Sequence, residues 1–169
     1  MCFCGTTNVW SLDIAPFSVN AGYTLQTDSN LFRQSSTSVV GARSERVGIS
    51  TLGLGFNTTQ SLQKFEVNLN LVDYSYKNFD YLSFTARNYD AAWRWSITPR
   101  WTGSLTSDRK ETLNSFTDYG NITQRNQRLD TNLRLDTSLE LSGPWRLVGG
   151  AARTKQENQQ VVLGDGDYR

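Results

Sequence analysis

The chain has 169 residues, and 17 basic against 16 acidic side chains leave a formal net charge of +1. This length suits one domain, and the near-neutral charge without a basic tract argues against nucleic acid as a partner. Histidine is absent, which removes Ser-His-Asp and Cys-His catalysis, histidine zinc sites and the usual general base near neutral pH. We therefore expect neither an enzyme nor a bound cofactor.

The N-terminal residues precede any patterned segment. Cys2 and Cys4 are one residue apart, which is not the C-x-x-C spacing of zinc or redox motifs, and no second cysteine pair completes a metal site. We expect residues 1–15 to be a leader or an unstructured segment. The sequence also contains no apolar run of about 20 residues, the length that a transmembrane helix requires.

Alternation of apolar and polar residues then predicts strands along the rest of the chain. Within residues 46–56 the apolar positions change from odd to even between Ile49 and Leu52. We expect a β-bulge near Ser50 and Thr51, because an inserted residue would restore the original facing. The predicted strands cover residues 17–27, 46–56, 62–76, 89–97, 101–106, 129–141 and 145–152.

The clearest alternation occupies residues 129–141, where leucine or threonine fills every odd position and a polar or charged residue every even one. Successive side chains of a strand point to opposite faces, so one face is apolar and the other polar. At about 3.3 Å per residue the segment spans roughly 43 Å, and a tilt near 45° reduces this to about 30 Å, the thickness of bilayer hydrocarbon. The pattern is typical of a transmembrane β-strand.

Short and long connections alternate between the predicted strands. Tight, turn-rich connections lie at residues 57–61, 98–100 and 142–144, and longer polar stretches lie near 33–45, 107–126 and 155–169. Antiparallel barrel strands of outer membranes run between periplasmic tight turns and extracellular long loops. Aromatic residues are expected to form a girdle at each end, as follows: Phe17, Phe56, Trp95, Trp101 and Trp145 near the tight turns; Tyr74, Tyr76, Phe79, Tyr81, Phe116 and Tyr119 near the long loops.

Charge decides which predicted face looks inward. An arginine such as Arg134 facing lipid near the midplane costs about 2–4 kcal/mol. The charged face should therefore line a wet lumen, where its side chains either serve conduction or form a salt-bridge lattice that holds the wall together. The predicted lumen residues are Arg94, Asp130, Arg134, Asp136 and Glu140.

Several segments resemble a known family. Asp28-Ser29-Asn30-Leu31-Phe32-Arg33 is similar to the Asp-x-Asn-Leu-Phe-Arg segment of bacterial outer-membrane β-barrels encoded with exopolysaccharide operons, the exosortase-associated EpsL-type family. Residues 64–67, 74–76 and 92–95 resemble that family's next strands. The similarity covers about residues 17–152 and implies an outer-membrane protein that assists polysaccharide secretion. The motif residues are Asp28, Asn30, Leu31, Phe32 and Arg33.

The expected fold is an all-β, antiparallel up-and-down transmembrane barrel over residues 16–169. An odd count of about seven strands predicts an N-terminal fragment of a larger barrel, since bacterial single-chain barrels use even numbers. The leading functional hypothesis is an outer-membrane channel for polysaccharide export. Its expected partners are outer-membrane lipid, polysaccharide cargo and periplasmic export machinery, the cargo by resemblance. The alternatives are a general porin or structural barrel, and a soluble carbohydrate-binding β-sandwich.

Overall fold

The computed structural model describes residues 4–32, 43–113, 125–160 and 164–169, which form nine strands and one 3₁₀ turn. The strands exceed the five or six residues usual in soluble domains, apart from the last. The strands are β1 (Cys4–Ile14), β2 (Phe17–Asp28), β3 (Glu45–Gln60), β4 (Gln63–Tyr76), β5 (Phe84–Thr98), β6 (Trp101–Leu113), β7 (Gln127–Glu140), β8 (Arg146–Asn158) and β9 (Gly166–Tyr168), and the 3₁₀ turn η1 is Asp80–Leu82.

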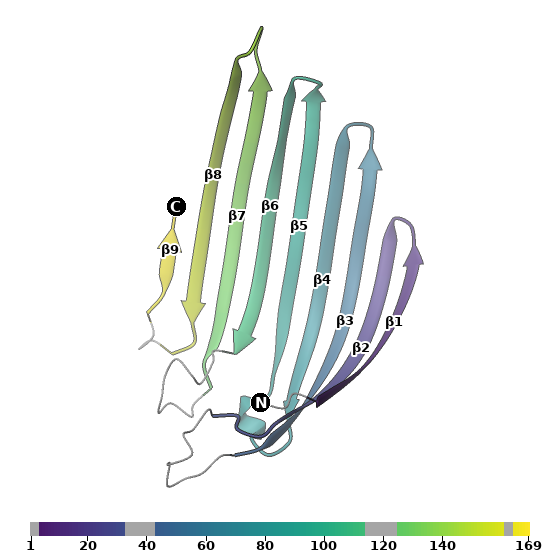
Figure 1. The fold of residues 1–169 in the computed structure, drawn as a ribbon, viewed down its shortest axis with the longest axis vertical. Helices are drawn as coiled ribbons and strands as arrows, with labels where there is room; N and C mark the ends of the chain where they lie inside the picture. Colours follow the sequence, from purple (N-terminus) through teal and green to yellow (C-terminus); the bar gives the residue numbers. More distant parts are fainter. Residues whose placement is uncertain (1–3, 33–42, 114–124, 161–163) are drawn as a thin grey trace.

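All nine strands belong to one curved antiparallel sheet in which each strand pairs with its neighbour in sequence (Figure 1). The predicted all-β, up-and-down antiparallel fold is confirmed, with nine strands instead of seven. The sheet is not closed into a barrel, because β1 and β9 are its two edges and do not pair with each other. Within the described residues, no helix is long and apolar enough to cross a membrane.

The expectation for residues 1–15 is wrong from Cys4 onward. Strand β1 pairs with β2 along its whole length, from Cys4 opposite Thr27 to Ile14 opposite Phe17. The alternation of β1 is weak in the sequence, because the polar residues Thr6 and Asn8 share a strand face with the apolar Trp10. Pairing with β2 supplies the order that the pattern alone did not indicate. Cys2 lies outside the described residues.

The predicted bulge near Ser50 and Thr51 is also wrong. Strand β3 pairs without a register shift through both residues, on β2 and on β4. The irregularity lies in β5 instead, between Ser96 and Thr98. Leu52, Leu54 and Phe56 lie on one face of β3, and Val47 and Ile49 lie on the other. The second face carries apolar residues at this end because a loop region, described below, covers it.

The sheet register divides the side chains between two faces. Directly opposed residues share a face, so Phe17, Phe56 and Val67 lie on one side, and Ser18, Gly55 and Asn68 lie on the other. We call the first side the apolar face and the second the polar face. Exposed apolar-face residues are Trp10, Leu12, Ile14, Phe17, Val19, Leu52, Leu54, Leu69, Leu71, Trp93, Trp101, Leu133, Leu135 and Leu147.

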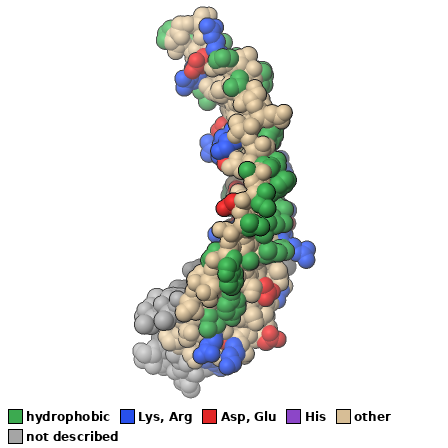
Figure 2. Space-filling view, turned by 90° about the vertical axis from the view of Figure 1, so that its right-hand side faces the viewer, with side chains coloured by type: hydrophobic (Ala, Val, Ile, Leu, Met, Phe, Trp, Pro, Cys, Tyr) green, Lys and Arg blue, Asp and Glu red, His purple; other side chains and the backbone are tan. Residues whose placement is uncertain are grey.

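The apolar face is exposed across the sheet. Trp10 keeps 68% of its surface accessible and Leu147 keeps 62%. Figure 2, viewed toward the β1 edge, shows hydrophobic side chains gathered in a continuous band. Soluble monomers rarely expose a contiguous apolar patch larger than a few hundred Å². A surface of this extent indicates a covering phase or partner.

The two ends of the sheet differ as the loop lengths predicted. Residues 15–16, 61–62, 99–100 and 141–145 make the short connections at the tight-turn end, and the strand ends that the longer connections join lie at the opposite, long-loop end (Figure 1). Aromatic rings do cluster on the apolar face at the tight-turn end, where Phe17 and Phe56 lie 5.2 Å apart between ring centroids.

The second aromatic girdle is wrong for three of its four described residues, Tyr74, Tyr76 and Phe79, whereas Tyr81 is exposed. Tyr74 and Tyr76 lie on the polar face, opposite Ile49 and Val47, where they cannot form an outward belt. Phe79 packs inside the cap, with its ring centroid 4.9 Å from that of Phe32. Phe116 and Tyr119 lie outside the described residues.

The buried core sits under a cap at the long-loop end of the polar face. We define the cap as residues 29–32, 43–44 and 77–83. Leu82 in η1 is fully buried, and Val47, Phe84 and Ala86 are buried on the polar face of β3 and β5. The polar face is therefore apolar where the cap covers it.

One carboxylate fastens the cap to the sheet. Glu45, only 1% exposed, accepts hydrogen bonds from the backbone N–H groups of Arg46 at 2.6 Å, Asn78 at 3.0 Å and Phe79 at 2.8 Å. These bonds satisfy both the buried charge and the loop backbone. The side chain of Glu45 thus joins the start of β3 to the β4–β5 loop.

Candidate functional site on the polar face

A row of amide and carboxylate side chains crosses the polar face perpendicular to the strands. The register places Asn68, Asp90, Asp108 and Asn132 directly opposite one another on β4, β5, β6 and β7. Asn68 Nδ2 donates to Asp90 Oδ2 at 2.7 Å, and Asn132 Nδ2 donates to Asp108 Oδ2 at 2.8 Å. We call these four residues the amide–carboxylate row.

A hollow of about 350 Å³ lies beside this row. Its lining includes Asn70, Asn88 and Lys110 from the polar face, together with Asp90 and Asp108. Asparagine amides both donate and accept hydrogen bonds, carboxylates accept them and an ammonium group donates them. The hollow therefore presents hydrogen-bond donors and acceptors of mixed charge.

Glycines of β3 make room for this polar surface. A Cβ atom at Gly53 would lie 1.8 Å from Asn20 Oδ1 and 2.8 Å from Asn70 Oδ1, and one at Gly55 would lie 2.3 Å from Ser18 Oγ. Side chains from β2 and β4 thus converge over the bare backbone of β3. This close packing explains the Gly-Leu-Gly sequence at residues 53–55.

All five predicted lumen residues lie on the polar face, but they do not form one centre. The Arg134 guanidinium contacts the Asp136 carboxylate at 2.6 Å, two residues along the same strand. Arg94 pairs with Glu66 on β4, and Arg146 Nη2 lies 2.9 Å from Glu140 Oε1 across β7 and β8. The fifth residue, Asp130, accepts from Arg128 Nη2 at 2.7 Å.

These ion pairs are local and mostly exposed. Pairs of this kind contribute about 0–1 kcal/mol each, so none of them is a major source of stability. Two of the four join neighbouring strands and two bind residues of one strand. Only two of the pairs can therefore hold neighbouring strands together, and the lattice interpretation and the role in conduction both stay predictions.

The motif residues of the first long loop shape the cap. Asp28 Oδ1 accepts from the backbone N–H of Asn30 at 2.9 Å, and Leu31 N–H donates to the Arg43 carbonyl at 3.0 Å. The Phe32 side chain is buried in the cap. These four residues therefore hold a loop, and Arg33 lies outside the described residues.

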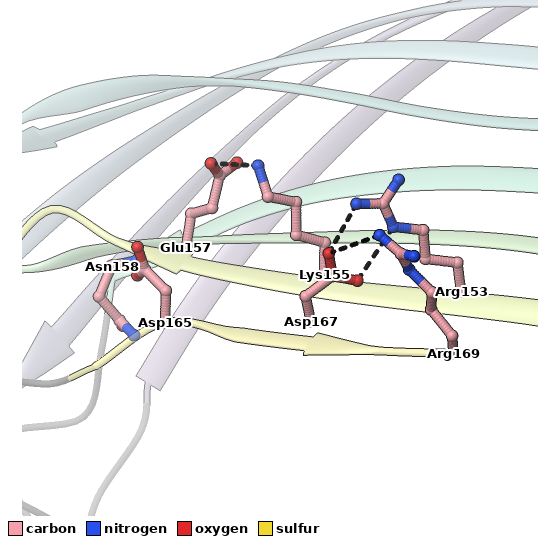
Figure 3. Close-up of polar contacts among 7 residues, drawn as sticks. All are labelled: Arg153, Lys155, Glu157, Asn158, Asp165, Asp167 and Arg169. Atoms are coloured by element: carbon pink, nitrogen blue, oxygen red, sulfur yellow. Dashed lines mark hydrogen bonds and ion pairs between the residues drawn. The ribbon is translucent and has the colours of Figure 1, made fainter.

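A second charged cluster lies at the long-loop end of the apolar face. Arg153 of β8 holds the Asp167 carboxylate of β9 through Nε at 2.9 Å and Nη2 at 2.6 Å, and Lys155 Nζ lies 2.6 Å from Glu157 Oε1 (Figure 3). The hydrogen bond from Arg153 lowers the pKa of Asp167 below its ordinary value. The cluster fastens the short β9 to β8.

The sequence patterns missed the amide–carboxylate row. Asp90 was placed on a polar face by its own alternation, but Asp108 lies beyond the predicted strand 101–106. Extending that strand by two residues would have brought both carboxylates onto one face. Their direct opposition depends on register, which no single strand pattern reveals.

Metal binding has no candidate among the residues that the structure describes, where no group of three or more His, Cys, Asp or Glu is placed to hold an ion. The comparisons with known proteins add no identification. No protein-family model, no curated protein and no solved structure matches the chain. The EpsL-type resemblance therefore stays a prediction.

Proposed function

We propose that this chain forms part of the wall of a bacterial outer-membrane β-barrel whose polar face lines an aqueous passage. The observation that carries the proposal is the exposed apolar face shared by strands β1 to β8. On β5 this face is apolar from Tyr89 to Ile97, and on β2 from Phe17 to Leu25. On these two strands the apolar stretch of about nine residues matches the 9–11 residues that a tilted strand needs to cross bilayer hydrocarbon. The stretch is shorter on β3, from Leu52 to Phe56, and on β6, from Trp101 to Leu105.

The polar face supports this orientation. Arg94, Arg134 and Asp136 are more than two-fifths exposed there, and each charge would be costly in lipid. Turning the sheet over would place these groups in hydrocarbon and the exposed leucines in water. The solvation of both faces therefore supports an inward-facing polar side.

The proposal also has a structural requirement. The free edges of β1 and β9 leave backbone N–H and C=O groups without ladder partners, and hydrocarbon offers no water to satisfy them. In the membrane, both edges must therefore pair with further strands of the barrel. A β-sandwich fits less well, because the described residues form one sheet and a sandwich needs two packed sheets.

We propose an extracellular polysaccharide as the cargo. The EpsL-type resemblance supports this, and the amide–carboxylate row offers the donors and acceptors that sugar hydroxyls use. The alternative is a general porin, which a specific observation favours: the tryptophans Trp10, Trp93 and Trp101 lie on the apolar face, where they cannot stack on sugar rings in the passage.

Two experiments test these proposals separately. Fractionation of the bacterial cells should recover the protein in the outer membrane and release it only with detergent, and recovery in the detergent-free soluble fraction would overturn the barrel. Deletion of the gene should abolish surface polysaccharide. Normal polysaccharide together with outer-membrane recovery would instead support the porin.

A further inference from the structure

A groove on the apolar face combines leucine side chains with two arginines. Its volume is about 280 Å³, and Leu52, Leu54, Leu69 and Leu71 form its floor on β3 and β4. Arg87 of β5 and Arg109 of β6 lie at its border, since Arg87 pairs with Leu71 and Arg109 pairs with Tyr89. We call this feature the arginine groove.

The groove lies where the apolar face ends. Leu52, Leu71 and Arg87 form one transverse row, and the next row toward the long loops is Ser50, Asp73 and Thr85. The change from leucine to polar side chains marks the edge of the apolar band. In a bilayer, the headgroup phosphates would lie at this level.

The two arginines differ in their partners. Arg109 pairs with Glu111 through Nη2 and donates from Nη1 to the Arg87 carbonyl at 2.8 Å. Asp73 accepts from Thr85 Oγ1 at 2.7 Å. No ion pair is formed by the Arg87 guanidinium within the described part of the chain, although its backbone N–H donates to Glu111 at 2.9 Å.

We propose that the arginine groove binds an anionic membrane lipid with a phosphate in its headgroup. The acyl chain lies along the four leucines, and the phosphate accepts hydrogen bonds from the exposed Arg87 guanidinium. A guanidinium matches the geometry of phosphate oxygens. Of the two carboxylates nearby, Glu111 forms its ion pair with Arg109 and Asp73 accepts from Thr85, so neither of them neutralises the Arg87 guanidinium through an ion pair. The proposal deepens the proposed function, because the site requires that the apolar face contact lipid.

The test measures lipid binding by the full chain in mild detergent, using native mass spectrometry. Phosphatidylglycerol and phosphatidylcholine with the same acyl chains serve as probes. We expect tighter binding of phosphatidylglycerol, and Arg87→Ala should weaken it about fivefold, toward the affinity for phosphatidylcholine. Inorganic phosphate at millimolar concentration should not compete.

Arg94→Ala is the matched control, because it removes an arginine from the polar face of the same strand. It should leave phosphatidylglycerol binding unchanged. Equal binding of the two lipids, an unchanged affinity in Arg87→Ala, an equal loss in Arg94→Ala or displacement by inorganic phosphate would each overturn the lipid site.

A second measurement separates this failure from failure of the proposed function. Bromine on the acyl chains of phosphatidylcholine quenches tryptophan fluorescence by contact, and Trp93 and Trp101 lie exposed on the apolar face. Quenching in reconstituted vesicles supports lipid contact even where the lipid preference is absent. Absence of quenching would overturn membrane insertion, and with it the lipid site.

Discussion

The polar face and the cap differ although they use the same side of the same strands. In the middle of β4 and β5 this side carries Asn68 and Asp90, and at the long-loop end it carries Tyr74 and Phe84, whose rings stack at 4.8 Å. The middle is open to solvent, and the end is covered by η1 and its neighbours. The polarity of the side chains on one sheet face therefore changes along the strands, according to whether solvent or the cap covers them.

The largest expected effect is in the cap. Leu82→Ala should lower the free energy of cap opening by about 2–5 kcal/mol, because the fully buried side chain would leave a cavity. Hydrogen exchange at the backbone amides of Asn78 and Phe79 measures this opening. Leu62→Ala, in an exposed turn, is the control and should leave the exchange unchanged. Equal protection in both variants would contradict a cap built around Leu82.

The second prediction compares the two faces on adjacent residues of β4. Leu69→Arg places a charge on the apolar face, one row inside the expected headgroup level, and should destabilise the membrane-inserted protein by about 1–2 kcal/mol, between the midplane and interface costs. Asn70→Arg places the same charge on the polar face, where water solvates it, and should change stability by less than about 1 kcal/mol. Urea titration of the protein in lipid vesicles measures both. A similar loss for the two variants would contradict the assignment of the faces.

The third prediction concerns the close packing over β3. Gly53→Ala should cost about 1–3 kcal/mol, because the new methyl group must displace the Asn20 and Asn70 side chains. Gly22→Ala, whose nearest atom would lie 3.5 Å away, should be neutral or slightly stabilising. Chemical denaturation of the two variants gives the difference. A Gly53→Ala protein as stable as Gly22→Ala would show that Asn20 and Asn70 move freely.

The same contrast explains how much of the fold the sequence predicts. The predicted strands 17–27 and 129–141 agree with β2 and β7 within two residues at each end, because their side chains alternate between the apolar face and the polar face over nearly their whole length. The predicted strand 89–97 misses the first five residues of β5, where Phe84 and Ala86 lie under the cap and Arg87 lies on the apolar face. The alternation pattern does not predict a strand where a loop covers the polar face and apolar residues therefore occupy it.

The sequence predicts only those features of the candidate site that lie within one strand. Arg134 and Asp136 could be assigned to one face from a single strand. The opposition of Asp90 to Asp108, and the fastening of the cap by Glu45, depend on residues of different strands and loops. Register and loop folding set these contacts, and neither leaves a periodic signal in one segment.

The smallest expected effect is a pH dependence of the β8–β9 contact at the edge of the sheet. Arg153 lowers the pKa of Asp167 in the folded protein, so this pairing stabilises the β8–β9 contact above the ordinary aspartate pKa of about 4. The contribution is lost as the pH falls through the lower folded value. Hydrogen exchange of β8 amides near Lys155 should therefore accelerate on acidification, relative to amides in β4.

In the Asp167→Asn variant these amides should exchange faster already at pH 7 and lose this pH dependence. An unchanged pH dependence in that variant would assign the effect to another carboxylate, and β9 would then be held to β8 chiefly by its backbone ladder.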